Sequence, residues 1–275
     1  MYNESCNTLA TMGLNDVLLD KKKILLVGNA TSMFTQAKPH GKSIDEDYDF
    51  VIRFGKGFPH PEFKQELGSR TDLWFFGQVR AGMYKHFTNV KWKIYTLACQ
   101  GAYDKNVHNI SVPRFMMDGR FQPYRDFALT GDLKYIKKVA DEIHGVGAAT
   151  RPSQGIQALH WLINVMNVDP KNITLVGFDF FGSEVRYTNA DGQTHQVSSW
   201  HMPLLASPND ADKQNPHKGT GDSESFAEER YVSELRANRG LNFIAMSNNA
   251  SDKQDRLEAV LAKMRGLDAK LLPQQ

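Results

Sequence analysis

The sequence predicts an α/β fold in which helices cover both faces of a mostly parallel sheet. Short apolar runs without polar alternation, typical of buried parallel strands, recur along the chain. Segments whose apolar residues have helical spacing separate several of these runs, and this alternation is the pattern of parallel sheets. The 275 residues suffice for one large domain, and no shift in composition marks a domain boundary.

Each predicted strand is a short and largely apolar run. The first is ILLVG at 24–28, which we expect to be buried on both faces. The other strands are expected at 48–54, 72–76, 91–97, 171–177 and 241–246. All of them have the length of ordinary strands.

Helices are predicted where apolar residues recur every three or four positions. They are expected at 131–144, 155–166, 223–237 and 252–265. A polar stretch at 183–222 lies between the last two strands, and a loop of that length is either functional or mobile. We therefore expect one domain over 21–275, preceded by an N-terminal extension over 1–20.

Composition excludes several classes of protein. The 33 basic and 31 acidic residues leave a net charge of +2, which gives no general reason to expect a nucleic-acid partner. Two cysteines cannot form a disulfide framework and favour a reducing compartment. The first twenty residues lack the features of a signal peptide, and no apolar run has the roughly 18 residues of a membrane helix. A soluble, cytoplasmic protein is expected.

Three predicted strands end in Gly28, Phe54 and Gly177. Ligands of parallel sheets bind at the carboxyl ends of the strands, so we expect the chemistry near these residues. Glycine after a buried strand permits a tight turn and the close approach of a ligand. Asn29, Thr31 and Ser32 follow Gly28 with short polar side chains. They predict either a mononucleotide contact or a turn with capping residues.

The turn does not match the common phosphate-binding loops. The dinucleotide fingerprint GxGxxG is absent. The triplet GKS at 41–43 lacks the upstream glycine of a Walker A loop, because Gln36 stands in that place, and it follows no strand. A kinase or another Rossmann enzyme is therefore disfavoured.

Two further segments contain polar side chains of interest. Ser153 precedes a strongly predicted helix, where it could cap the first turn or leave the helix amides to a phosphate. Asp45 and Asp47 have the Asp-x-Asp spacing with which many sugar-nucleotide enzymes hold a metal. They precede a strand and so lie at the opposite edge of the sheet, which predicts a solvated loop instead.

The polar stretch contains three histidines, His195, His201 and His217. None of them has the close spacing of a two-histidine metal helix. A neutral histidine near pH 7 is a suitable general base for a hydroxyl proton, and a solvated histidine is the alternative.

The order of several sequence blocks resembles the sialyltransferases of glycosyltransferase family 29. VGN at 27–29 precedes IDEDYDFVIR at 44–53 and LGSRT at 67–71, as in the large sialyl motif of that family. PSQG at 152–155 and VGF at 176–178 resemble its small motif, and SESFAE at 223–228 its last motif. The resemblance covers roughly residues 24 to 240.

The resemblance implies a single Rossmann-like α/β/α domain of the GT-A-variant, sialyltransferase-like type. The activity would be inverting transfer from a cytidine-monophosphate sugar to a glycan hydroxyl, with no metal and no cofactor besides the nucleotide-sugar co-substrate. The nucleotide would be bound by Gly28, Asn29, Thr31, Ser32, Ser153, Gln154 and Gly155. His217, or alternatively His201, would be the base. Arg53, Asp179 and Glu228 would be supporting residues.

Two departures from the family pattern leave alternatives open. Gly55 stands where the family has an asparagine that helps to hold the phosphate, so the donor sugar is open. Ser223 stands where the family has the basic histidine, which directs attention to His217. The acceptor could be a glycan or a hydroxymethylated DNA base, and a non-catalytic nucleotide-sugar-binding module is the other alternative. Lys134, Lys137 and Lys138 are a faint indication for DNA, but a solvated helix face also explains them. The oligomeric state is open.

Overall fold

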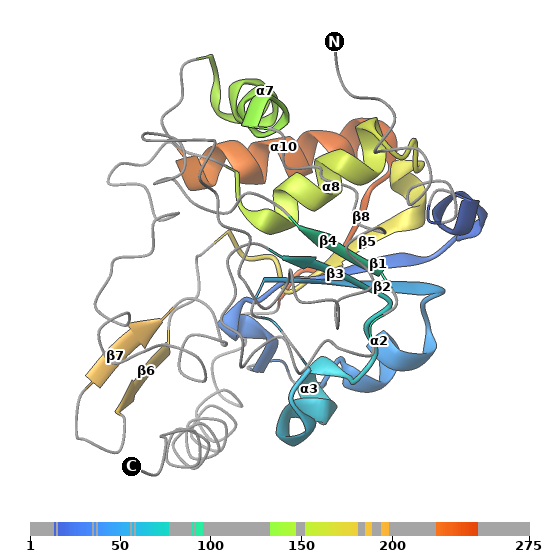
Figure 1. The fold of residues 1–275 in the computed structure, drawn as a ribbon. Helices are drawn as coiled ribbons and strands as arrows, with labels where there is room; N and C mark the ends of the chain where they lie inside the picture. Colours follow the sequence, from blue (N-terminus) through green and yellow to red (C-terminus); the bar gives the residue numbers. More distant parts are fainter. Residues whose placement is uncertain are drawn as a thin grey trace, which may run out of the picture.

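The computed structural model describes residues 14, 16–34, 36, 38–55, 57, 59–76, 90, 92–95, 133–146, 152–180, 185–188, 194–197 and 224–246. These residues form an α/β fold around a six-stranded sheet with the order β4-β3-β2-β1-β5-β8 (Figure 1). The strands are β1 (Ile24–Val27), β2 (Phe50–Phe54), β3 (Leu73–Phe76), β4 (Trp92–Tyr95), β5 (Ile173–Val176) and β8 (Asn242–Phe243). Every pairing within this sheet is parallel, which confirms the predicted α/β class with a parallel sheet and is compatible with a Rossmann-like domain.

Strand β1 lies in the middle of the sheet and is buried on both faces. Ile24 and Leu26 belong to the apolar cluster under one helical layer, whereas Leu25 and Val27 belong to the cluster on the other face. Successive side chains of a strand point to opposite faces, so a strand covered on both sides must be apolar at every position. The run ILLV meets this requirement.

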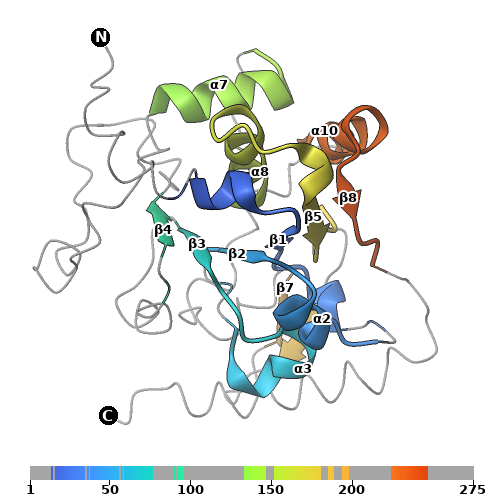
Figure 2. The same cartoon turned by 90° about the vertical axis from the view of Figure 1, so that its right-hand side faces the viewer.

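Helices cover both faces of the sheet, as Figures 1 and 2 show. On one face lie α7 (Leu133–His144), α8 (Gln154–Asn164) and α10 (Glu224–Arg239). The other face is covered by shorter elements: η1 (Thr31–Phe34), α2 (Gly41–Glu46), η2 (Pro61–Phe63) and α3 (Lys64–Leu67). The short helix η6 (Pro170–Asn172) leads into β5.

The structure differs from the sequence predictions in three places. The Asp45 segment forms the helix α2 instead of a solvated loop. The polar stretch at 183–222 contains an antiparallel hairpin of β6 (Val185–Thr188) and β7 (Thr194–Val197). Leu14 and Leu18 are buried in the main core, so the core begins within the segment predicted as an N-terminal extension.

Two other predictions concern helices. The helix expected at 252–265 lies outside the described residues. Among the helices that are described, none combines the length and the apolar character that crossing a membrane requires.

Candidate functional site

The strand order reverses between β1 and β5. Strands β2, β3 and β4 follow β1 outward on one side, and β5 returns to pair with β1 on the other. In open parallel sheets, ligands bind in the crevice outside the carboxyl ends of the two strands at such a switch point. We refer to the residues that follow these strands and begin α8, namely 28–32, 153–155 and 177–179, as the switch-point site.

The turns after β1 and β5 are joined by their backbones. The N–H of Gly28 donates to the Val176 carbonyl at 2.7 Å, and the N–H of Ala30 donates to the Gly177 carbonyl at 3.2 Å. A β-carbon at Gly28 would overlap the carbonyl oxygen of Gly177. Position 28 therefore requires glycine so that the two turns can pack closely, whether or not a ligand also approaches it.

A side-chain hydrogen bond also links the two turns. Ser32 Oγ donates to Asp179 Oδ2 at 3.2 Å, and Asp179 is half-buried. The Ser32 carbonyl accepts from Gln36 Nε2 at 2.7 Å. Thr31 and Ser32, which were predicted to bind a nucleotide, are 1% and 6% exposed, so they lie beneath the surface of the site. Asn29 and Asp179 are more accessible.

Ser153 begins α8 and caps it. Its Oγ accepts from the Ile156 N–H at 3.4 Å and donates to Glu228 Oε2 at 2.8 Å, while its own N–H donates to Glu228 Oε1 at 2.6 Å. Glu228 comes from α10, and its side chain is buried. A helix N-terminus attracts negative charge, and here an internal carboxylate already occupies part of that position. Gln154 and Gly155 follow as the first two helical residues, whose N–H groups have no acceptor within an α-helix.

The turn after β2 reaches the same site. Asn29 Nδ2 donates to the Phe54 carbonyl at 3.3 Å. Gly55 has a φ of +51°, and a β-carbon there would lie 2.5 Å from Gln154 Oε1. Glycine is favoured at this position for two reasons: its backbone has a positive φ, and a β-carbon would collide with the neighbouring amide. The structure thus brings together the three predicted strand ends and the start of α8.

Arg53, on β2, is fully buried. Its Nε donates to the Arg70 carbonyl at 2.9 Å and its Nη2 to the Leu67 carbonyl at 2.5 Å. Burial lowers the pKa of Arg53 to about 10, and the nearby charge of Asp45 opposes that shift. These contacts attach the chain before β3 to strand β2.

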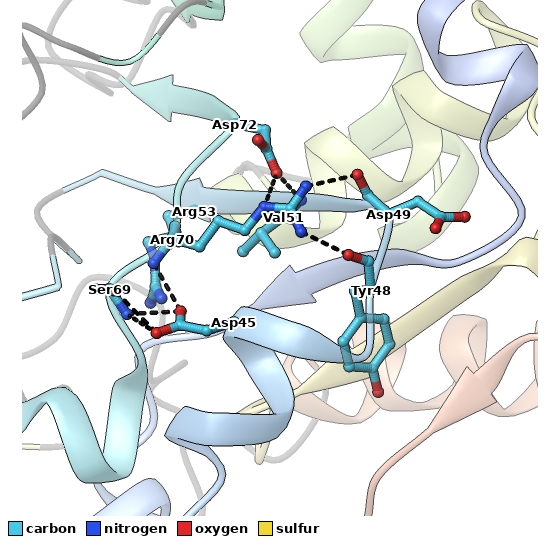
Figure 3. A network of polar contacts seen from close by, with 8 residues as sticks. All are labelled: Asp45, Tyr48, Asp49, Val51, Arg53, Ser69, Arg70 and Asp72. Carbon is cyan, nitrogen blue, oxygen red and sulfur yellow. Dashed lines mark hydrogen bonds and ion pairs between the residues drawn. The ribbon is translucent and has the colours of Figure 1, made fainter.

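Figure 3 shows a polar network around Arg70, in which Asp45 and Asp72 accept from backbone N–H groups. Asp45 accepts from the N–H groups of Ser69 and Arg70, at 2.7 and 2.8 Å, and from Ser69 Oγ at 2.9 Å. Asp49 Oδ2 accepts from two backbone N–H groups before β1, and Asp72 Oδ2 accepts from the Val51 N–H at 2.8 Å. These carboxylates fix the start of β1, β2 and β3 relative to one another.

Within the described part of the chain, no group of three or more His, Cys, Asp or Glu side chains is placed to hold a metal ion.

The predicted catalytic histidines are not placed. His201 and His217 lie outside the described residues, and only the backbone of His195 is described, in β7. A histidine that sequence analysis missed is His144, the last residue of α7. Its side chain is 4% exposed, and its Nε2 lies 3.8 Å from Glu228 Oε1. The sequence feature that could have identified His144 is its position next to the apolar face of the helix predicted at 131–144.

No protein-family model and no curated protein matches the chain. A function is therefore inferred from the site itself, because many functions share a parallel α/β fold.

Proposed function

We propose that the chain is an inverting glycosyltransferase with a GT-A-variant, sialyltransferase-like domain. It would transfer a sugar from a nucleotide donor, CMP-sialic acid or a related CMP-sugar, to an acceptor hydroxyl of a glycan. The proposal is supported chiefly by one observation. The segments at 27–32, 152–155 and 176–179, which contain the blocks that resemble that family, meet at the switch point of the sheet.

In this proposal the nucleotide lies across the turns after β1 and β5. Asn29 supplies an amide that can donate and accept hydrogen bonds. The first N–H groups of α8, at Gln154 and Gly155, face the phosphate, where they and the helix dipole offset its charge. Ser153 and Glu228 hold the helix start in position through their two hydrogen bonds.

The reaction requires one base and one leaving group. His217, or alternatively His201, takes the proton of the acceptor hydroxyl as its oxygen bonds to the anomeric carbon of the sugar. The bond from that carbon to the phosphate oxygen breaks on the opposite face, and CMP leaves with the electron pair. Only one phosphate leaves with the nucleotide. Backbone N–H groups at a helix N-terminus and neutral hydrogen-bond donors are groups that can stabilise the negative charge on it.

A thermal-shift panel tests the nucleotide. CMP, UMP, CDP and UDP are each added with and without Mn²⁺, and the melting temperature is followed as a function of concentration. A ligand of the folded state at 100 times its Kd stabilises by about 2.7 kcal/mol. We expect CMP to raise the melting temperature without Mn²⁺. Stabilisation by UDP with Mn²⁺ alone would contradict the proposal.

Asn29→Ala is the matched site variant. It should weaken CMP binding about tenfold, which corresponds to one hydrogen bond of roughly 1.4 kcal/mol. Glu234→Ala is the control, because Glu234 is 63% exposed on α10 and pairs only loosely, at 4.0 Å, with Arg230. Equal CMP affinity of all three proteins would place the nucleotide elsewhere.

A transfer assay then tests the reaction class. CMP-sialic acid is incubated with a panel of glycans and, separately, with duplex DNA containing hydroxymethylated cytosine. Product on glycan supports the proposal, and product on DNA alone supports the alternative acceptor. CMP binding without hydrolysis or transfer would support a binding module. His217→Ala and His201→Ala identify the base, since only the loss of the true base removes transfer while CMP binding remains.

A further inference from the structure

The side chain of His144 is buried, with 4% of it exposed. Among the residues that the structure describes, neither Nδ1 nor Nε2 has a partner in hydrogen-bonding geometry. Buried polar atoms in proteins are nearly always paired, so an unpaired histidine calls for an explanation. Hydrophobic packing alone would be served better by phenylalanine or leucine at this position.

His144 lies beside the carboxylate that holds the start of α8. Its Nε2 is 3.8 Å from Glu228 Oε1, about 0.6 Å beyond hydrogen-bonding distance. The same Oε1 accepts the N–H of Ser153 at 2.6 Å, and Oε2 accepts the Ser153 hydroxyl at 2.8 Å. If Glu228 moved slightly toward His144, its hydrogen bonds to Ser153 would therefore lengthen and weaken.

The protonation state of His144 changes the charge at the start of α8. Burial lowers the pKa of His144, so the ring is neutral at pH 7 and carries no charge that could offset a negative charge on the Glu228 carboxylate. A proton on His144 would offset that charge and draw Glu228 toward the ring. Both changes make the N-terminus of α8 a better site for an anion, because the dipole and the N–H groups then face less competition.

The other titratable groups considered on α7, α8 and α10 have different surroundings from His144. His160 of α8 has its own partner, Glu142 Oε2, at 3.1 Å. Burial raises the pKa of Tyr231 to about 12, so this residue of α10 stays neutral below pH 8. Asp141 is a half-buried residue of α7. Of the histidines on these helices, His144 is the one whose ring lies within 4 Å of the carboxylate bonded to Ser153.

We propose that His144 is a positioning residue of the nucleotide site: acting through Glu228, it couples proton uptake to the binding of a phosphate ester at the start of α8. This inference rests on the proposed function, because it assumes that the phosphate of CMP binds there. Proton binding and phosphate binding strengthen each other by the same factor, as linkage requires. Nucleotide binding near pH 6 should therefore be accompanied by proton uptake at His144.

Isothermal titration calorimetry of CMP at pH 6.0 and 7.5, in buffers of different ionisation enthalpy, measures both affinity and protons bound. The comparison is between wild type and His144→Phe, which keeps a ring without nitrogens. His144→Gln is a second variant if the first is poorly folded. The titration of CMP itself is common to all proteins and cancels in the comparison. We expect wild type to gain about tenfold more affinity than the variants on acidification, which equals one pKa unit of coupling. The variants should take up fewer protons.

His160→Phe is the matched control, since it removes a second buried histidine from the same interface but leaves Glu228 and Ser153 untouched. It should keep the proton uptake of wild type. Equal proton uptake by wild type and His144→Phe, with CMP bound to both, would overturn this inference and leave the proposed function standing. Absence of CMP binding to the wild-type protein would overturn both.

Discussion

The carboxylate of Glu228 accepts two hydrogen bonds from Ser153, one from its N–H at 2.6 Å and one from its hydroxyl at 2.8 Å. The two residues are 75 positions apart in the sequence, and their contact joins α10 to the start of α8. Hydrogen bonds to a charged group contribute about 1.5–3 kcal/mol each. Glu228→Gln replaces one acceptor by a donor, so we expect a loss of about 2–3 kcal/mol in the free energy of unfolding, measured with urea.

Glu234→Gln on the same helix is the control for that prediction. Its side chain is 63% exposed and its ion pair with Arg230 is long, at 4.0 Å. Exposed pairs of this kind contribute little, so the change should stay within about 0.5 kcal/mol. Similar losses in the two variants would mean that charge on α10, and not the contact with Ser153, determines stability.

Asp45 is expected to be structural. Asp45→Asn replaces one of two oxygens that accept from Ser69 and Arg70, and it also removes the charge near buried Arg53. Loss of a charged acceptor from these N–H groups should cost about 1–3 kcal/mol in urea unfolding. Glu46→Gln, the next residue of α2, should cost no more than about 0.5 kcal/mol, because its pair with Lys42 is exposed.

Manganese provides an independent check on Asp45. If this carboxylate serves the backbone, Mn²⁺ should not raise the melting temperature of wild type more than that of Asp45→Asn. A larger rise in wild type would show that Asp45 ligates a metal.

The contact between Gly55 and Gln154 can be tested by moving a side-chain amide from residue 154 to residue 55 and measuring CMP binding. A β-carbon at Gly55 would lie 2.5 Å from Gln154 Oε1, so Gly55→Asn should displace Gln154 and weaken CMP binding. Gln154→Ala should also weaken it, by removing the amide. Asparagine tolerates positive φ better than most residues. The double variant places an amide from residue 55 in the vacated space, so we expect it to bind CMP more tightly than either single variant. Additive losses in the calorimeter would contradict this expectation.

His144 should make stability depend on pH. Burial lowers its pKa below the usual 6.5, so the unfolded chain binds the proton more readily than the folded protein. Stability therefore rises with pH through the interval from the folded pKa to about 6.5, and it is lost as pH falls through that interval. Urea unfolding between pH 5 and 7.5 should show a steeper decline on acidification for wild type than for His144→Phe. A shallower decline for wild type would mean that the attraction of Glu228 outweighs burial.

Sequence patterns were sufficient where the physical cause is local. The run ILLV at 24–27 had to be a doubly covered strand because it has no polar face, and β1 has that environment. The helix after Ser153 follows from its apolar spacing and its capping residue, and both are observed. Helices α2 and α3 were missed because six and four residues are too few to show a period of 3.6.

The order of strands along the sheet is not a local property. That β5 returns to lie beside β1, and so creates the switch point, depends on which apolar faces are left to be covered once all the elements pack. The polar contacts of the site have the same origin. From its position, Ser153 was predicted either to cap the helix or to leave the helix amides to a phosphate, but its two bonds to Glu228 require α8 and α10 to lie side by side.

By itself, the sequence determined the α/β class, most of the described strands and the three long helices, because propensity and periodicity act over a few neighbouring residues. Only the tertiary structure decided that β2 and β5 are the neighbours of β1, so that Gly28 packs against Gly177, and that His144 lies against Glu228. Such contacts join residues far apart in the chain, and they form only when burial of the two apolar clusters fixes the layers of the fold.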